Sequence, residues 1–202
     1  MSTRSKEMDP LSIIKSDRTE ARKVQDANAD ICFLALAAKD GLASVRTLVV
    51  RDIVNRAIRL FINSTSPKWQ SLNDGAHYEL LLWYPSQQKQ YRIQGETSMV
   101  EPEEVKTNWF RRPQGSKRLD YVYKEFAAQS SEIASREVLT DEIARIKDAY
   151  KPDDMTPPDS ATGIELIATR VEMLDLNRED RIHDRRVFYF EQGEWQQTFI
   201  VP

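Results

Sequence analysis

The sequence gathers basic residues and one histidine into a short stretch before an aromatic run near its carboxyl end. Residues 181–186 read RIHDRR, and VFYF follows them. Arginine binds carboxylates and phosphates through paired N–H donors, and histidine can hold or move a proton near neutral pH. A solvated cluster of surface ion pairs would have the same composition. The stretch therefore indicates either an anion site or a charged surface, and its residues alone leave both open.

Three further cations lie near the ends of predicted elements. Arg46 and Arg51 belong to one β-branched run, and their five-residue spacing puts them on opposite faces of a regular strand. Lys68 lies in the first turn of a predicted short helix after Ser66, where free backbone N–H groups favour an anion. These cations are candidates for a phosphate site, and charges at strand ends are the more ordinary explanation.

Polar residues in the middle of the chain form two more candidate groups. Arg112 and Ser116 belong to the stretch RRPQGS, whose arginines would also complement the dipole of the preceding helix. Gln129 and Ser130 belong to an uncharged QSS stretch, for which capping of the next helix is the alternative explanation. Gln90 lies among bulky strand residues and needs a partner if it is buried.

The usual short catalytic signatures are absent from the sequence. It contains no GxGxxG, P-loop, GxSxG or HExxH pattern. His77, His183 and Cys32 are too few to predict a structural zinc site, so we expect no metal. Cys32 lies in the apolar run ICFLALAA, which predicts a buried thiol rather than a nucleophile.

Length and charge limit the possible partners. The 202 residues suit a single domain, and 29 basic against 32 acidic residues give a net charge of −3. This balance does not favour binding to nucleic acid. No signal-peptide core and no apolar run of about 18 residues is present. We therefore expect a cytoplasmic protein that does not enter membranes.

Strands and short helices are the elements predicted to position these residues. Helices are expected over residues 11–27, after Ser66, over 101–112 and after Ser135, and residues 113–131 are expected to be loop with a short helix. The strands are expected at residues 29–41, 43–53, 57–64, 77–85, 88–100, 164–176, 185–193 and 194–202. Regular crossover helices are missing, so we predict a small closed barrel with peripheral helices. Residues 1–202 form one domain in this prediction, with 1–8 as a disordered tail.

Several stretches, in this order, resemble the pyridoxamine 5′-phosphate oxidase family of FMN-binding split barrels. The stretches that carry the resemblance are DPLSII, RTLVVR, NSTSPK, KQYRIQG, RRPQGS, QSSEIASRE, RIHDRRVFY and EWQQTFIVP. Together they cover residues 9–202, nearly the whole chain. The resemblance implies a mainly β fold with peripheral helices (α+β), a homodimer, and two FMN sites across the dimer interface.

The resemblance assigns FMN contacts to residues from most of these stretches. They are Arg46, Thr47, Leu48, Val49, Arg51, Phe61, Ile62, Lys68, Gln90, Gln129, Ser130 and Arg185. Gln129 and Ser130 would reach the flavin from the other subunit's side. Three positions depart from the family pattern: Arg51 replaces a lysine, Pro67 replaces an arginine, and Phe61-Ile62 replaces a Tyr-Thr pair.

The resemblance also assigns residues to the substrate. Arg181 and His183 would face it, with Asp184 as an orienting partner, and Arg51, Arg112 and Ser116 would bind its phosphate. Two substitutions stand at the site. Asn108 falls where the family has a tyrosine, and Leu174 falls where it has a tryptophan against the flavin.

The implied reaction is the oxidation of a phosphorylated B6 vitamer to pyridoxal 5′-phosphate by FMN and O₂, as part of vitamin B6 metabolism. Two alternatives remain: a flavoprotein reductase or oxidase of the same fold with another substrate, and a non-enzymatic FMN or pyridoxal phosphate binding protein. The changes at Pro67, Asn108 and Leu174 favour another substrate. The retained residues that favour a phosphorylated pyridine are Arg112, Ser116, Arg181 and His183.

Overall fold

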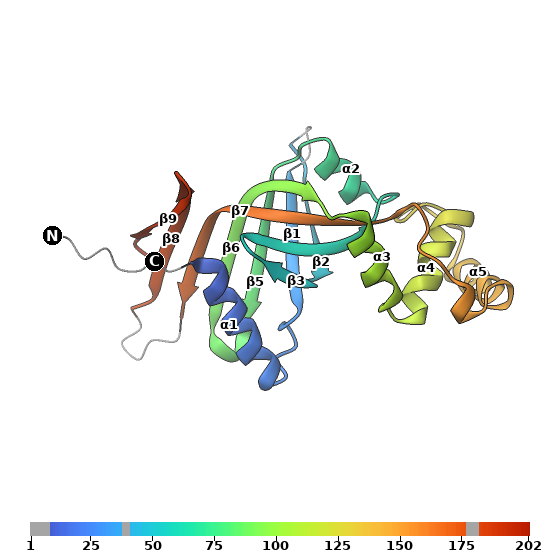
Figure 1. The fold of residues 1–202 in the computed structure, drawn as a ribbon, viewed down its shortest axis with the longest axis horizontal. Helices are drawn as coiled ribbons and strands as arrows, with labels where there is room; N and C mark the ends of the chain where they lie inside the picture. Colours follow the sequence, from blue (N-terminus) through green and yellow to red (C-terminus); the bar gives the residue numbers. More distant parts are fainter. Residues whose placement is uncertain (1–8, 38–40, 177–181) are drawn as a thin grey trace. The chain divides into compact units, whose positions relative to one another are not determined.

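A computed structural model of the chain describes residues 9–37, 41–176 and 182–202, and strands dominate it (Figure 1). The strands are β1 (Ile31–Ala37), β2 (Ala43–Val49), β3 (Asp52–Val54), β4 (Ala57–Asn63), β5 (Tyr78–Tyr84), β6 (Lys89–Met99), β7 (Ala161–Asp175), β8 (Asp184–Glu191) and β9 (Glu194–Phe199). The helices are α1 (Pro10–Lys23), α2 (Pro67–Asn73), α3 (Pro102–Phe110), α4 (Gln114–Glu125) and α5 (Arg136–Ala149).

Within the described residues, nine strands form one sheet. Its order is β2-β1-β5-β6-β7-β4-β3, and β8 pairs with both β7 and β9. The β1–β2, β5–β6, β7–β8 and β8–β9 pairs are antiparallel hairpins between consecutive strands. This agrees with the predicted mainly β fold, as a curled half-barrel sheet rather than a closed ring.

Internal contacts divide the chain into two compact units. The sheet unit takes residues up to 60, residues 76–98 and residues from 165 onward. The helical unit takes residues 61–75 and 99–164, which include α2, α3, α4 and α5. The single domain predicted from the sequence stays a prediction, and each unit is described below by itself.

Alternating strands and one amphipathic helix build the core of the sheet unit. Leu34 on β1 and Leu80 and Leu82 on β5 are fully buried, as period-2 alternation requires. In α1, Asp9 caps the amino end by accepting hydrogen bonds from the backbone of Leu11 and Ser12. The sequence predicted this helix, although it ends at Lys23 rather than at residue 27.

The helical unit has its own apolar core on α3, α4 and α5. Trp109, Tyr121, Val122, Ile146 and Met155 are buried together. Residues 113–131 were predicted as loop with a short helix, and the helix found there, α4, is longer than predicted, with 12 residues. The cause is that the buried face of α4 includes Lys117 and Asp120, whose charges hide the apolar period.

Two turns define strand ends in the sheet unit. The sequence missed β3, a three-residue strand that pairs with β4 through a turn in which Asn55 has φ +50°. The predicted hairpin between β8 and β9 is confirmed. Gln192 and Gly193 have φ values of +52° and +89°, as a two-residue hairpin turn requires.

Candidate flavin and substrate site

Arg46 is the flavin candidate whose surroundings in the sheet unit are most telling. It lies on β2 opposite Leu34, and its Nη2 donates to Ser44 Oγ. Its Nη1 is buried and has no hydrogen-bond partner. Burial also lowers the pKa of Arg46. A buried guanidinium nitrogen without a partner indicates a missing acceptor, such as an oxygen of a bound ligand.

The other β2 candidates lie beside Arg46, but Arg51 does not share its strand. Leu48 is half-buried, whereas Thr47 and Val49 are exposed. The strand ends at Val49, so the face predicted for Arg51 from a regular strand does not apply. Arg51 is exposed, and its backbone N–H donates to the carbonyl of Arg59 at 3.0 Å.

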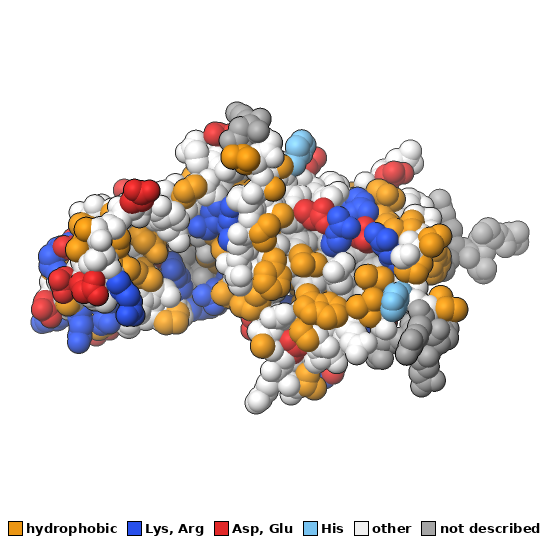
Figure 2. All heavy atoms as spheres, turned by 180° about the vertical axis from the view of Figure 1, so that it is seen from behind, with side chains coloured by type: hydrophobic (Ala, Val, Ile, Leu, Met, Phe, Trp, Pro, Cys, Tyr) orange, Lys and Arg blue, Asp and Glu red, His pale blue; other side chains and the backbone are white. Residues whose placement is uncertain are grey.

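Arg185 belongs to a cluster of arginines around one buried carboxylate. Glu172 is only 3% exposed, and its Oε1 accepts hydrogen bonds from Arg185 Nε at 3.0 Å and Nη2 at 2.8 Å. Arg170 binds Oε2 at 2.7 Å, and Arg92 approaches Oε1 at 3.4 Å. Burial alone would raise the pKa of Glu172, but Arg170 and Arg185 outweigh it and the pKa lies below its ordinary value. Figure 2 shows acidic and basic side chains gathered on one face of the molecule.

The RIHDRR stretch is only partly described. Arg181 lies outside the described residues. His183 is half-buried, and its Nδ1 has no hydrogen-bond partner among the described residues. Asp184, expected to orient a neighbour, accepts a hydrogen bond from Arg186 Nε at 2.9 Å. Asp184 and Arg186 therefore lie on the opposite face of β8 from Arg185.

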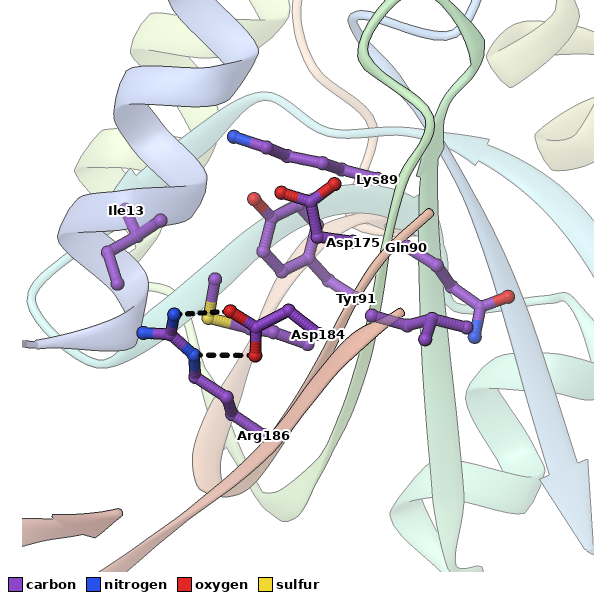
Figure 3. A pocket seen from close by; sticks show the side chains of 9 residues that line it. Ile13, Lys89, Gln90, Tyr91, Asp175, Asp184 and Arg186 are labelled. Atoms are coloured by element: carbon purple, nitrogen blue, oxygen red, sulfur yellow. Dashed lines mark hydrogen bonds and ion pairs between the residues drawn. The ribbon is translucent and has the colours of Figure 1, made fainter. Parts of the chain in front are cut away.

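A pocket of about 190 Å³ opens between α1, β6, β7 and β8 (Figure 3). Its lining residues are Ile13, Lys89, Gln90, Tyr91, Met173, Leu174, Asp175, Asp184 and Arg186. Gln90 and Leu174 are the flavin-related positions among them. The side chain of Gln90 points away from Tyr91 and Lys89 (Figure 3). Lys89 in turn donates to Asp17 on α1 at 2.9 Å.

The helical unit brings two flavin candidates together. Lys68 Nζ donates to Gln129 Oε1 at 3.0 Å, and the backbone of Gln129 donates to Thr65 Oγ1 at 3.0 Å. These contacts join residues of one chain, whereas the resemblance placed Gln129 on the partner's side of the flavin. Ser130 has φ +74°, a strained conformation of the kind found at ligand sites. The side chain of Ile62 is buried in the protein, so a ligand could contact this residue only through its backbone.

Arg112, a substrate candidate, is bound to a carboxylate that the sequence reading missed. Its Nη1 donates to Asp120 Oδ2 at 2.5 Å. Trp109 Nε1 donates to the same oxygen at 2.8 Å, and Asn63 Nδ2 lies 3.5 Å from Oδ1. Burial raises the pKa of Asp120 in spite of these partners. Ser116 is half-buried one helical turn before Asp120 on α4.

Several polar atoms near these candidates are buried without a hydrogen-bond partner. They are Asn108 Oδ1, Gln114 Oε1 and Arg118 Nε. Asn108 was predicted from the resemblance, but Gln114 and Arg118 were not, since nothing in their spacing distinguishes them from an ordinary polar helix face. Neither Glu172 nor Asp120 could be found from the sequence, because a carboxylate's partner is visible only in the fold.

Other chemistries find little support in the described residues. Cys32 is buried and burial raises its pKa to about 12, as expected for a thiol that is not a nucleophile. Across residues 9–37, 41–176 and 182–202, no three His, Cys, Asp or Glu side chains form a metal-binding group. None of the described helices is long and apolar enough to span a membrane.

Comparison with known proteins decides the family. The family model described as pyridoxamine 5′-phosphate oxidase matches residues 19–150. The chain belongs to the pyridoxamine 5′-phosphate oxidase family. Curated relatives named pyridoxine/pyridoxamine 5′-phosphate oxidase include one from Psychrobacter sp. strain PRwf-1, 28% identical over 96% of this chain and 90% of its own length. Another, from Zymomonas mobilis, is 26% identical over 96% of this chain and 98% of its own length.

Solved structures confirm the fold. PhzG from Burkholderia lata 383, solved in complex with tetrahydrophenazine-1-carboxylic acid, superposes with a TM-score of 0.85 at 23% identity, covering 99% of this chain and 95% of its own. A pyridoxamine 5′-phosphate oxidase-related, FMN-binding protein from Nostoc punctiforme gives a TM-score of 0.77 at 16% identity and covers both chains fully. The mainly β split-barrel fold with peripheral helices is therefore confirmed.

FMN is the cofactor of this pyridoxamine 5′-phosphate oxidase family, and the expectation of FMN is confirmed at that level. The residues of this chain fit such a group. Arg46 has a buried nitrogen that lacks an acceptor, and Lys68 and Gln129 converge on each other in the helical unit. Donors of this kind suit the oxygens of a flavin and its phosphate.

Proposed function

We propose that the protein is an FMN-dependent oxidase that removes a hydride from a small ring substrate. The observation that carries the proposal is the buried, partnerless Nη1 of Arg46, at a position that the family resemblance assigns to the flavin. Family membership supports an oxidoreductase. The residues proposed to hold FMN are Arg46, Thr47, Leu48, Val49, Arg51, Phe61, Ile62, Lys68, Gln90, Gln129, Ser130 and Arg185.

The chain's own contribution is binding and orientation. When bound, FMN supplies hydride acceptance and passes the electrons to O₂. We propose that Arg181 and His183 face the substrate. His183 supports this role, because its Nδ1 is buried without a partner and can exchange a hydrogen bond with a ligand. Oxidation of an alcohol or an amine releases a proton from its O–H or N–H as well as the hydride from carbon. This proton leaves to solvent, and no residue of the protein is assigned to take it.

A phosphorylated B6 vitamer is the first candidate substrate. It is favoured by the names of the curated relatives, which are pyridoxine/pyridoxamine 5′-phosphate oxidases. Arg112 and Ser116 are the residues proposed to bind its phosphate. The product would be pyridoxal 5′-phosphate, in the cytoplasm, as part of vitamin B6 metabolism.

A second candidate is the same flavin chemistry on another small substrate. One specific observation favours it: the Arg112 guanidinium, the proposed phosphate ligand, is already bound to the buried carboxylate of Asp120. Asn108 also replaces a phenol at the substrate position. PhzG, which resembles this chain in fold, was solved in complex with tetrahydrophenazine-1-carboxylic acid, a ring compound that carries a carboxylic acid.

We also propose that the functional form is a homodimer with FMN at the interface. Exposed apolar side chains on β2, next to Arg46, support this proposal. Val45 is 67% exposed and Val49 is 45% exposed. Apolar surface of this kind is normally covered by a partner.

The test is a visible absorption spectrum of the purified protein, followed by anaerobic addition of pyridoxine 5′-phosphate. A yellow protein that bleaches and regains its colour in air supports the oxidation of a phosphorylated vitamer. A yellow protein that does not respond supports the second candidate. A colourless protein that also fails to take up added FMN contradicts the proposal and favours a non-enzymatic binding protein.

A further inference from the structure

Asp120 lies on the same helical face as a proposed substrate ligand. Ser116 and Asp120 are four residues apart on α4, so their side chains point to the same side of the helix one turn apart. Arg112 precedes the helix and reaches Asp120 with its Nη1 at 2.5 Å. A negative charge is therefore built into the group of residues that the proposed function assigns to the substrate's anion.

Asp120 is not an incidental surface carboxylate. Its side chain is only 3% exposed, while that of Arg112 is 20% exposed. Its Oδ2 also accepts a hydrogen bond from Trp109 Nε1 at 2.8 Å. Separating a buried carboxylate from its cationic partner strongly destabilises the folded protein. The ion pair with Asp120 therefore keeps the Arg112 guanidinium in its position. The positive charge of Arg112 is consequently balanced before any ligand arrives.

This balance penalises a phosphate more than a carboxylate. A ligand that approaches Arg112 is attracted by one positive charge and repelled by one negative charge behind it. Attraction and repulsion both scale with the ligand's charge, so Asp120 takes away about twice as much favourable interaction from a dianionic phosphate as from a carboxylate. The phosphate still has two charges to desolvate, so it loses the advantage that its second charge would have beside an unpaired arginine. The hydrogen-bond capacity of Arg112 remains, because a guanidinium has five N–H donors and Asp120 takes one contact from Nη1.

We propose that the substrate carries a carboxylate, rather than a phosphate, where it meets Arg112 and Ser116, and that Asp120 sets this preference. The inference rests on the proposed function, because it takes Arg112 and Ser116 as substrate ligands. It goes further in naming the charge of the substrate and the residue that selects it. Asp120 acts through Arg112 and is therefore a specificity-determining residue, not a catalytic one.

The test compares two pyridine ligands that carry different anions on the same ring carbon. Pyridoxal 5′-phosphate carries a phosphate ester there, and 5-pyridoxate carries a carboxylate. The two also differ at the neighbouring carbon, which bears an aldehyde in the first and a hydroxymethyl group in the second, so the decisive quantity is how their ratio changes between wild type and variant. Isothermal titration of each into the FMN-loaded protein gives a ratio of dissociation constants. We expect the wild type to bind 5-pyridoxate more tightly. We expect Asp120→Asn, which keeps the shape of the side chain and removes its charge, to shift the ratio at least tenfold toward the phosphate.

Two control variants identify the cause of the shift. Glu125→Gln removes a carboxylate from the same helix, one that pairs with Arg145 and Tyr150, and should leave the ratio unchanged. Adding Arg112→Met to Asp120→Asn should abolish the gain for the phosphate. A misfolded variant would lose affinity, so a gain in affinity for the phosphate cannot arise from misfolding. If Asp120→Asn fails to fold, the ratio of the two dissociation constants in the wild type still tests the preference.

The outcomes separate this inference from the proposed function. Tighter binding of pyridoxal 5′-phosphate by the wild type, with no change of the ratio in Asp120→Asn, would overturn the inference and leave the proposed oxidase intact. If neither ligand binds and Arg112→Met changes nothing, the substrate site is misplaced and both proposals fail. A preference for 5-pyridoxate that Asp120→Asn reverses supports both.

Discussion

The Nη1 of Arg46 is buried without a hydrogen-bond partner among the described residues, and burial lowers the pKa of the guanidinium. Because a buried charge without a partner is costly, a bound anion or carbonyl oxygen should stabilise the charged form of Arg46. We predict that Arg46→Ala weakens FMN binding. The loss of a charged hydrogen bond corresponds to about 1.5–3 kcal/mol, or roughly a ten- to hundredfold weaker affinity. Quenching of FMN fluorescence during titration of flavin-free protein measures the dissociation constant.

Ser44→Ala is the control for Arg46→Ala. Ser44 Oγ accepts from Arg46 Nη2, and its loss leaves the charge and Nη1 in place. The dissociation constant should then change by less than about threefold, a difference below 1 kcal/mol. Unchanged FMN affinity in Arg46→Ala would contradict the position of the flavin on β2.

Glu172 is the carboxylate that the Arg170 and Arg185 side chains share, whereas Arg92 also pairs with Glu79. We predict that Glu172→Gln lowers the free energy of unfolding at pH 7 by roughly 2–3 kcal/mol, since it removes the charged partner of the partly buried Arg170 and Arg185. The folded pKa of Glu172 is lowered. The stabilisation by Glu172 is therefore complete above the ordinary glutamate pKa of about 4.3 and is lost as the pH falls through the lower folded pKa.

Thermal melts of wild type and Glu172→Gln between pH 7 and acid pH test this sign. Their difference should shrink as the pH falls, because a protonated glutamic acid resembles glutamine. The control is Glu20→Gln, which removes an exposed ion pair with Lys23 and should cost less than about 1 kcal/mol at any pH. A Glu172→Gln effect that does not vary with pH would show that its charge is irrelevant.

At the scale of single residues, the sequence predicted the arginines of the site but not the carboxylates that bind them. Arg46, Arg112 and Arg185 were found as candidates, because basic residues in known motifs can be recognised from the chain. Their carboxylate partners were not found. Glu172 reads as one residue of a strand and Asp120 as one residue of a helix, and only pairing across the fold reveals that they hold arginines.

At the scale of elements, the close pairing of β6 with β7 leaves no room for a side chain at Gly95. A Cβ there would lie 1.9 Å from the carbonyl oxygen of Ile167 and 2.8 Å from the nitrogen of Thr169. We predict that Gly95→Ala costs about 3 kcal/mol or more, since backbone atoms cannot move aside as a flexible side chain can. Urea unfolding followed by tryptophan fluorescence measures the loss.

Gly115→Ala makes the matched change in an open position. A Cβ at Gly115, in the first turn of α4, would meet nothing within 4 Å. Alanine favours a helix over glycine by up to about 1 kcal/mol, so this variant should be as stable as the wild type or more stable. Equal stability of the two glycine variants would argue against the tight pairing of β6 and β7.

Helices and strands could be predicted where apolar residues follow a regular spacing. The prediction failed where an element is very short or where charged residues occupy its buried face. Strands β1 and β5 and the caps of α2 and α5 could be predicted, because the apolar residues and the capping side chains Ser66 and Ser135 stand at recognisable positions. β3 has only three residues, too few for any period. The length of α4 was underestimated because Asp120 and Lys117 occupy its buried face, and Asp120 is the residue to which the substrate preference is assigned.

For the whole molecule, motif order along residues 9–202 predicted the family and the mainly β fold. The proposed assembly of two chains is harder to predict from one sequence. The structural feature that supports it is β2, which ends the strand order of the described sheet and exposes residues on both faces. An exposed apolar edge strand invites association and is normally covered.

We predict that Val45→Glu, on β2, converts a dimer into a monomer and weakens FMN binding, since a buried unpaired carboxylate opposes association. Light scattering of the wild type should give twice the chain mass of 23.4 kDa.

The control is Val24→Glu, at the end of α1, where valine is 64% exposed against 67% for Val45. It should stay dimeric and yellow. A wild-type monomer, or a Val45→Glu monomer that binds FMN normally, would contradict a flavin site shared between subunits, because such a site is incomplete in one chain.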